Sequence, residues 1–180
     1  SKFTTLINRE IKNAKAGKKA EIFLKLNNLV DEDVIEKLYA ASKSGVKVRL
    51  IVRGINSLVP QLAGFSENIE AISIVDKFLE HTRIFSFYNE GKPDVYIGSA
   101  DLMTRNLDHR IEVVLPILDE KIKKQLLQIM ELQWQDNTKA RLFNATQTNV
   151  LKTKTPKEKA LRSQDAIYDF WKDFAKKKRG

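Results

Sequence analysis

Hydrophobic and polar positions in the first third of the chain predict two helices that alternate with two strands. Apolar residues recur every three or four positions over 3–15, and the apolar run 20–26 is typical of a buried strand. Asp31 favours a helix N-cap, and Ser44-Gly45 closes the helix that begins there. The β-branched run 46–52 predicts the second strand. Strand, helix and strand in this order indicate a parallel crossover unit, which binds ligands at the carboxyl ends of its strands.

The remaining pattern continues in the same α/β style. Further strand-like runs cover 69–74, 83–88, 95–98 and 110–115. Asp119 favours the start of a long amphipathic helix.

The carboxyl-terminal part of the chain changes character near residue 144. Thr, Asn and Lys dominate from there to residue 160, and the apolar face of a last helix follows over 162–178. We therefore predict an α/β domain over residues 1–145, a linker over 146–160, and a helix with a basic tail over 161–180 that packs on the same domain.

Composition removes several classes of protein. The chain has 180 residues, no cysteine and two histidines, which excludes a disulfide scaffold, a thiolate zinc site and a cysteine nucleophile. No apolar run is long enough to cross a membrane. The chain begins Ser1-Lys2-Phe3, without a methionine or an apolar signal core, and we interpret it as a piece of a longer protein, with a processed chain as the alternative.

The positive charge is concentrated at one end. The net charge is +9, of which residues 151–180 carry +6 and the first 150 residues +3. A basic chain suits nucleic acid, an acidic membrane surface or a phosphate compound. We interpret the tail as mainly a solvated helix end, so the charge that matters for function is the smaller part on the folded domain.

Three groups of polar residues at predicted strand ends could bind phosphate. Arg53-Gly54 follows the strand 46–52, and a guanidinium offers a planar fork to phosphate oxygens. His81 and Arg83 stand two residues apart at the start of the next-but-one strand, so strand alternation predicts one shared face. A neutral imidazole beside a cation suits phosphoryl chemistry. The alternatives are an arginine that satisfies loop carbonyls and a packed or surface histidine.

The third group is the turn that begins at Gly98. Gly98-Ser99-Ala100-Asp101 ends a strand, and small residues in a turn can hold an anion through backbone amides. We expect polyanion contacts at Arg83 and also at Ser99, Arg105, Asn106 and Arg110. No metal ligands are predicted in this chain. Each group is a weak signal by itself, and their convergence at strand ends favours a phosphate site.

Five strings carry a resemblance to a known family: LKLNNLVD (24–31), LYAASKSGVKVRLIVRG (38–54), SENIEAISIVDKFLEHTRI (66–84), VYIGSADLMTRNLDHRIEV (95–113) and AIYDFWK (166–172). In order and spacing they resemble the carboxyl-terminal part of bacterial polyphosphate kinases. That family is similar to the phospholipase D superfamily, which implies a mixed or parallel sheet flanked by helices, with a docked carboxyl-terminal helix.

The superfamily motif is only partly present. His81-Thr82-Arg83 resembles the pattern His-x-Lys with Arg in place of Lys, Tyr88 stands where the pattern has Asp, and Gly98-Ser99 resembles its later turn. These departures argue against a phosphodiesterase.

The resemblance implies reversible transfer of the ATP γ-phosphate to inorganic polyphosphate, with Mg²⁺, through a phosphohistidine in a preceding domain. It makes His81 the second, catalytic histidine and Arg53 a ligand of nucleotide phosphate, and it places the magnesium ligands upstream of this chain. Implied partners are ATP or ADP, polyphosphate, the preceding domains of the same polypeptide and further copies in a homo-oligomer, without a specific nucleic acid. The implied location is the cytoplasm, either free or peripheral at the inner face of the membrane. The chain alone is expected to be inactive.

Two alternatives stay open. The chain could be a module that binds polyphosphate or nucleic acid by charge without chemistry. It could also be a half-site phosphodiesterase of the phospholipase D type, in which two copies of His81 meet in a dimer.

Overall fold

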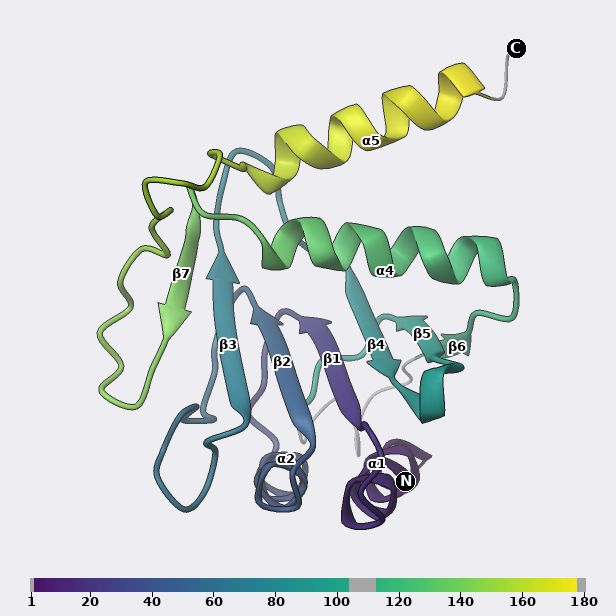
Figure 1. Ribbon diagram of the computed structural model, residues 1–180, viewed down its shortest axis with the longest axis vertical. Helices are drawn as coiled ribbons and strands as arrows, with labels where there is room; N and C mark the ends of the chain where they lie inside the picture. The colour runs from purple at the N-terminus through teal and green to yellow at the C-terminus, as the bar shows by residue number, and fades with distance from the viewer. Residues whose placement is uncertain (1, 104–112, 178–180) are drawn as a thin grey trace.

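A mixed β-sheet forms the centre of the protein (Figure 1). The computed structural model describes residues 2–103 and 113–177. Within these residues the strands are β1 (Glu21–Leu26), β2 (Lys47–Val52), β3 (Ile69–Ile74), β4 (Arg83–Phe87), β5 (Asp94–Gly98), β6 (Val114–Pro116) and β7 (Ala140–Phe143). They lie in the order β6-β5-β4-β1-β2-β3-β7. β1, β2 and β3 are parallel, whereas β4 is antiparallel to β1 and β5, and β7 is antiparallel to β3.

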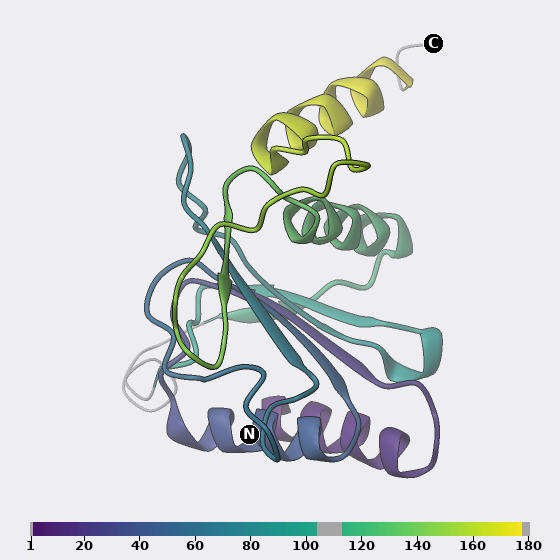
Figure 2. The same ribbon diagram turned by 60° about the vertical axis from the view of Figure 1, so that its left-hand side comes forward.

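Helices cover both faces of this sheet (Figure 2). The described helices are α1 (Lys2–Lys15), α2 (Glu32–Lys43), the short 3₁₀ turn η1 (Asn89–Gly91), α4 (Glu120–Trp134) and α5 (Ser163–Lys177). α1 and α2 lie on one face and α4 lies on the other, with α5 stacked beyond α4 (Figures 1 and 2). Within the described ranges no helix is both long and apolar enough to cross a membrane.

The alternation of side chains along β1 divides the apolar core into two clusters. Leu24 and Leu26 point to the α1/α2 side and belong to the larger cluster, whereas Phe23 belongs to a smaller cluster with Met130 of α4. Lys25 also points to the α4 side and is almost completely buried, with 2% of its side chain exposed. The α4 face of the sheet therefore combines apolar packing with a buried charge.

The predicted elements agree with the structure within a few residues. Asp31 caps α2, since its side chain accepts a hydrogen bond from the backbone N–H of Val34 at 3.1 Å. The strand predicted over 110–115 is observed as β6, Val114–Pro116, and residues 110–112 lie outside the described ranges. β7 was not predicted, because four residues without clear alternation give a weak strand pattern. The α/β fold class with a carboxyl-terminal helix is confirmed.

The segment between β7 and α5, for which a linker over 146–160 is predicted, runs back beside β7. The backbone N–H of Leu142 donates to the carbonyl of Val150, and that of Lys152 donates to the carbonyl of Ala140. α5 then begins against the carboxyl end of α4. Farther along, a hollow of about 650 Å³ separates α5 from α4, so the helix is held most closely at its start.

Candidate functional site

The predicted strand-end residues lie on one edge of the sheet. Leu26 at the end of β1 pairs with Val52 at the end of β2. Because β4 is antiparallel to β1 and β5, its first residue, Arg83, lies at the same edge and pairs with Gly98. The structure thus brings the segments that carry Arg53, His81 and Ser99 to one side of the molecule, although they are far apart in the sequence.

Asp101 is the buried acceptor at the centre of this edge. Only 4% of the residue is exposed. Its Oδ1 accepts hydrogen bonds from the backbone N–H of Asn27 at 2.9 Å and from Arg83 Nε at 3.2 Å. Its Oδ2 accepts from Asn28 Nδ2 and from Arg83 Nη2, both at 3.1 Å. The two bonds from Arg83 form a bidentate ion pair, which fixes the orientation of the guanidinium.

These donors also determine the charge state of Asp101. Burial alone would raise the pKa of its carboxyl group, but hydrogen bonds from Arg83 and from the backbone N–H of Asn27 outweigh burial and lower it. Asp101 therefore stays ionised at neutral pH and neutralises Arg83.

His81 lies beside the guanidinium of Arg83. The histidine is exposed and stands two residues before β4, which begins at Arg83. Arg83 Nη1 donates to the carbonyl oxygen of His81 at 2.9 Å and lies 3.0 Å from its Nδ1. Nη1 also lies 3.4 Å from Nε2, so the guanidinium lies against the ring and is not aligned with one nitrogen; which ring nitrogen carries the proton depends on the tautomer. A neutral imidazole has one N–H donor, and because His81 is exposed that donor can reach a phosphoryl oxygen of a ligand.

Arg53 is half-buried at the end of β2. Its Nε donates to the side-chain oxygen of Asn27 at 3.1 Å. Among the described residues no carboxylate forms an ion pair with Arg53, whereas Arg83 is neutralised by Asp101. Arg53 is therefore the better suited of the two to hold an external anion.

Gly54 is required by the crossing of two backbone segments. A Cβ at this position would lie 2.6 Å from Asn28 Oδ1 and 2.9 Å from the carbonyl oxygen of Asn27. The backbone N–H of Gly54 donates to that same carbonyl at 2.7 Å. The close approach that glycine permits here is therefore to Asn27 and Asn28, and the predicted approach of this backbone to an anion stays a prediction.

The remaining predicted contacts lie at the turn after β5. Ser99 is exposed, and its hydroxyl oxygen accepts from the backbone N–H of Val113 at 3.2 Å. Arg105, Asn106 and Arg110 lie outside the described residues. Their expected polyanion contacts stay predictions.

The sequence interpretation did not single out a buried ion pair behind the site. Lys25 Nζ lies 3.2 Å from Glu80 Oε2. Burial, the largest influence, lowers the pKa of Lys25; Glu80 opposes this, and the charges of Arg53 and Arg83 lower the pKa further. The signal was present, because Lys25 is the one charge inside the otherwise apolar run 22–26.

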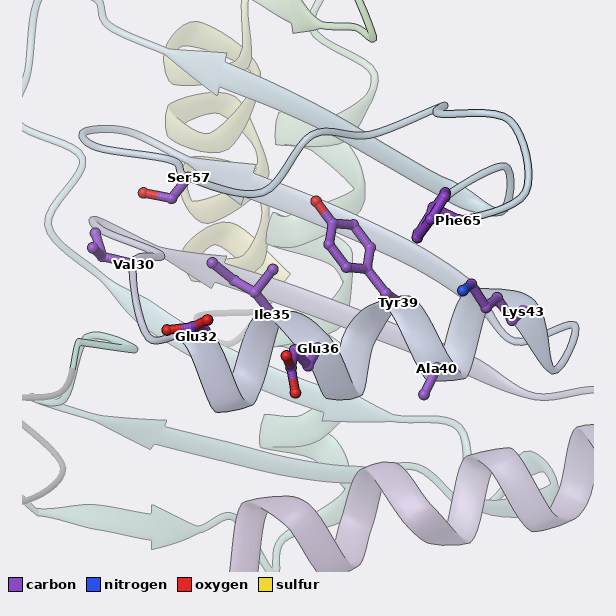
Figure 3. Close-up of a pocket in the computed structure, with 9 residues that line it drawn as sticks. All are labelled: Val30, Glu32, Ile35, Glu36, Tyr39, Ala40, Lys43, Ser57 and Phe65. Atoms are coloured by element: carbon purple, nitrogen blue, oxygen red, sulfur yellow. The ribbon is translucent and has the colours of Figure 1, made fainter.

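A large groove along α2 is not suited to phosphate (Figure 3). It has a volume of about 670 Å³ and is lined by Glu32, Glu36 and Tyr39, among others. The two carboxylates would repel a polyanion. The ammonium group of Lys43 lies over the ring of Phe65, with Nζ 4.1 Å from the ring centroid, and is thus already engaged in a cation–π contact. We therefore assign the candidate site to the sheet edge and not to this groove.

Comparison with known proteins shows the family of the chain. Residues 1–164 match the family model described as polyphosphate kinase C-terminal domain 2. The chain is 52% identical over 176 residues to a polyphosphate kinase of Vibrio vulnificus (strain YJ016), covering 98% of this chain and 25% of that protein. It is 49% identical over 167 residues to a polyphosphate kinase of Escherichia coli (strain K12), covering 93% of this chain and 24% of that protein. The chain thus spans about a quarter of the length of these relatives.

Solved structures show the same relationship. The crystal structure of polyphosphate kinase from Porphyromonas gingivalis is 44% identical, with a TM-score of 0.94 over 97% of this chain and 27% of that one. Nuc from Salmonella typhimurium, a phospholipase D family member, has a TM-score of 0.54 at 16% identity over 76% of this chain and 90% of that one, which shows a likeness of fold alone. By sequence and by structure, the chain belongs to the polyphosphate kinase family, as its C-terminal domain 2.

Proposed function

We propose that this chain supplies one half of an active site that transfers the γ-phosphate of ATP reversibly to inorganic polyphosphate. The observation that carries the proposal is the meeting of His81, Arg83 and Arg53 at one sheet edge, where Arg53 has no carboxylate partner among the described residues. Phosphoryl transfer depends mainly on positioning and on stabilising charge, and cations with a proton donor are the groups that it needs. The relatives are named polyphosphate kinase, and this name supports ATP and polyphosphate as the proposed substrates.

Within this proposal each residue has a distinct role. Arg53 binds the phosphates of the nucleotide, and the imidazole of His81 protonates or orients the oxygen that leaves or enters at the transferred phosphorus. Arg83 holds the ring of His81 and adds positive charge. The phosphoryl group leaves ADP and bonds to the nitrogen of a histidine in the preceding part of the polypeptide, and the terminal oxygen of polyphosphate then accepts it.

Magnesium does not fit the described residues of this edge. Asp101 is occupied by donors from Arg83, Asn27 and Asn28, and Glu80 is occupied by Lys25 and by two glutamine side chains. Within the described ranges no group of three His, Asp or Glu side chains could hold a metal ion. We derive no step of the reaction through magnesium and assign no ligand for it to these residues.

The same proposal covers the cellular setting. ATP or ADP, polyphosphate and the preceding domains are the partners of this chain, and a homo-oligomer is the proposed assembly. Because the proposed reaction uses ATP, we place the protein in the cytoplasm. It is either free there or attached peripherally to the inner face of the membrane.

The test uses the full-length enzyme that carries this chain. His81→Ala should reduce ATP-dependent polymer synthesis by at least about 100-fold, as expected for the loss of proton transfer by a positioned side chain. Arg53→Ala should mainly raise the KM for ATP. Lys176→Ala removes a positive charge from the exposed side of α5 and should leave both constants unchanged. Normal synthesis by His81→Ala would contradict the proposal.

Charge-driven binding without chemistry has a different signature. It predicts binding of polyphosphate or nucleic acid that weakens steeply with salt and does not depend on His81. Measuring polyphosphate affinity for the wild-type chain and for His81→Ala at several salt concentrations separates it from the enzymatic proposal.

A further inference from the structure

The segment that carries His81 is a loop with few apolar anchors of its own. We call residues 75–82, between β3 and β4, the histidine loop. Three of its apolar residues are exposed: Val75 by 71%, Phe78 by 64% and Leu79 by 71%. In Figure 1 the connection between β3 and β4 rises beyond the edge of the sheet and passes close to the start of α5. Its position therefore depends on polar contacts with neighbouring elements.

The start of α5 supplies several of these contacts. Arg162, just before the helix, donates from Nε and Nη2 to the two carboxylate oxygens of Asp76, each at 2.7 Å. These hydrogen bonds lower the pKa of Asp76, so the pair stays ionised at neutral pH. A bidentate pair of this kind fixes direction as well as distance.

Gln164, in the first turn of α5, holds the middle of the loop. Its side-chain oxygen accepts from the backbone N–H of Phe78 at 3.0 Å, and its Nε2 donates to the carbonyl of Phe78 at 2.9 Å. The same Nε2 donates to Glu80 Oε1 at 2.9 Å. One side chain thus satisfies both backbone groups of Phe78 and also reaches the residue that precedes His81.

Glu80 connects this contact to the body of the protein. Its Oε2 accepts from Gln133 of α4 at 2.6 Å and lies 3.2 Å from Lys25 Nζ of β1. α5 is itself anchored, because the fully buried Asp136 accepts from the backbone N–H of Ser163 at 2.7 Å. The residue next to His81 is therefore held from β1, α4 and α5 together.

Arg53 is held by a different set of groups. Its Nε donates to Asn27, which follows β1, and its carbonyl accepts from Ser73 of β3 at 3.3 Å. These contacts come from the sheet and not from α5. A disturbance of α5 should consequently move His81 more than it moves Arg53.

We infer that α5 positions His81 for phosphoryl transfer, with Arg162 and Gln164 as the positioning residues. The inference rests on the proposed function, in which His81 acts on the transferred phosphoryl group and Arg53 binds the nucleotide. It assigns the carboxyl-terminal helix a part in the rate of the reaction and not in the binding of ATP.

The first test is Gln164→Glu in the full-length enzyme. The glutamate is nearly the same size and can accept from Phe78, but it cannot donate to Phe78 or Glu80 and it opposes the charge of Glu80. We expect kcat to fall at least about tenfold, because small displacements of a reacting group are costly, while the KM for ATP and the melting temperature stay close to wild type. Lys172→Gln, which changes the charge by the same unit on the exposed side of α5, is the control and should have wild-type kcat.

A second test uses the ion pair between Arg162 and Asp76, which ties the start of the histidine loop to α5. Asp76→Ala, Arg162→Ala and the double variant should each lower kcat, and the double variant should lose no more than the more affected single variant, since both changes release the same loop. Additive losses in kcat would overturn the inference.

The outcomes separate this inference from the proposed function. If His81→Ala is inactive and Gln164→Glu has normal kcat, the positioning role is wrong and the proposed function stands. If kcat falls only together with a raised KM and a lowered melting temperature, α5 stabilises the whole domain and the positioning role is again wrong. If His81→Ala retains activity, the proposed function fails, and the role of α5 fails with it.

Discussion

Arg53 and His81 lie at the same edge of the sheet but are held by different parts of the fold. Arg53 continues directly from β2 and is bonded to Asn27 at the end of β1. His81 belongs to the histidine loop, which is tied to α5 through Arg162 and Gln164. The nucleotide side of the proposed site is therefore built on the sheet, and the histidine side is built on a loop that a distant helix supports.

This difference suggests which changes should affect binding and which should affect rate. Strand ends in a hydrogen-bonded sheet are rigid, because the ladder and the core restrain them. A loop supported by side chains can shift without unfolding the domain. Asp101 links the two sides. It accepts from the backbone N–H of Asn27, whose side chain accepts from Arg53, and it accepts from Arg83, which also donates to the carbonyl of His81.

The largest expected effect is the loss of this link. Asp101→Ala should destabilise the protein by about 3–5 kcal/mol, because it leaves a half-buried arginine and a buried backbone N–H without their acceptor. Urea unfolding measures this loss, and the full-length variant should be inactive. A loss below about 1 kcal/mol would mean that Arg83 and Asn27 are held by other groups.

The second prediction disturbs only the helix side. Asp136 is fully buried and its Oδ1 accepts from the backbone N–H groups of Thr138, Lys139 and Ala140. Asp136→Ala should cost about 2–4 kcal/mol, since several buried donors lose their acceptor. In the full-length enzyme kcat should fall more than the KM for ATP rises. An equal change in both constants would remove the distinction between the two sides.

The third prediction disturbs only the sheet side. Gly54→Ala places a Cβ within 2.9 Å of the Asn27 carbonyl oxygen, which moves the backbone next to Arg53. The expected cost is about 1–3 kcal/mol, as for other overpacked sites. Steady-state kinetics should show a raised KM for ATP with a smaller change in kcat, opposite to Gln164→Glu. Ala63→Gly, on an exposed part of the following loop, serves as a control for backbone effects.

The smallest expected effect is a decrease in the free energy of unfolding at low pH. The folded-state pKa of Asp101 is lowered, so its contribution is present above the unfolded-state pKa and is lost as the pH falls through the folded-state value. Below about pH 4 the free energy of unfolding should decrease by at most about 1.4 kcal/mol per pH unit for this one group. Asp101→Asn should lack this component, and its unfolding curves should approach those of wild type as the pH falls. Parallel curves would exclude Asp101 as the titrating group.

The sequence predicted much of the fold because the core strands have a strong apolar pattern. β1, β2 and β3 were placed within one or two residues, and the cap at Asp31 was identified from its residue type. β7 was missed because its position depends on pairing with β3 and not on a pattern of its own. Arg53, His81 and Arg83 were predicted as site residues from their places at strand ends, and the assignment of their roles stays a prediction.

The roles of Asp101, Glu80 and Gln164 needed the tertiary structure. In the sequence Asp101 is one residue of a small-residue turn, and Gln164 is one polar residue at the start of a helix that is predicted to dock through its apolar face. Their hydrogen-bond partners lie 74 and 86 residues away, at Asn27 and Phe78. Side-chain periodicity reports which face is buried, but it does not report which distant segment lies against it.

The sequence by itself therefore determined the α/β order of elements, the position of a cationic edge and the family. These depend on local patterns of burial and on motifs, which are readable residue by residue. Only the tertiary structure decided that Arg83 is neutralised by Asp101 while no carboxylate of the described residues pairs with Arg53, and that α5 reaches back to the loop of His81. The physical reason is that a charge or an amide is defined by its partners, and those partners meet only when the chain has folded.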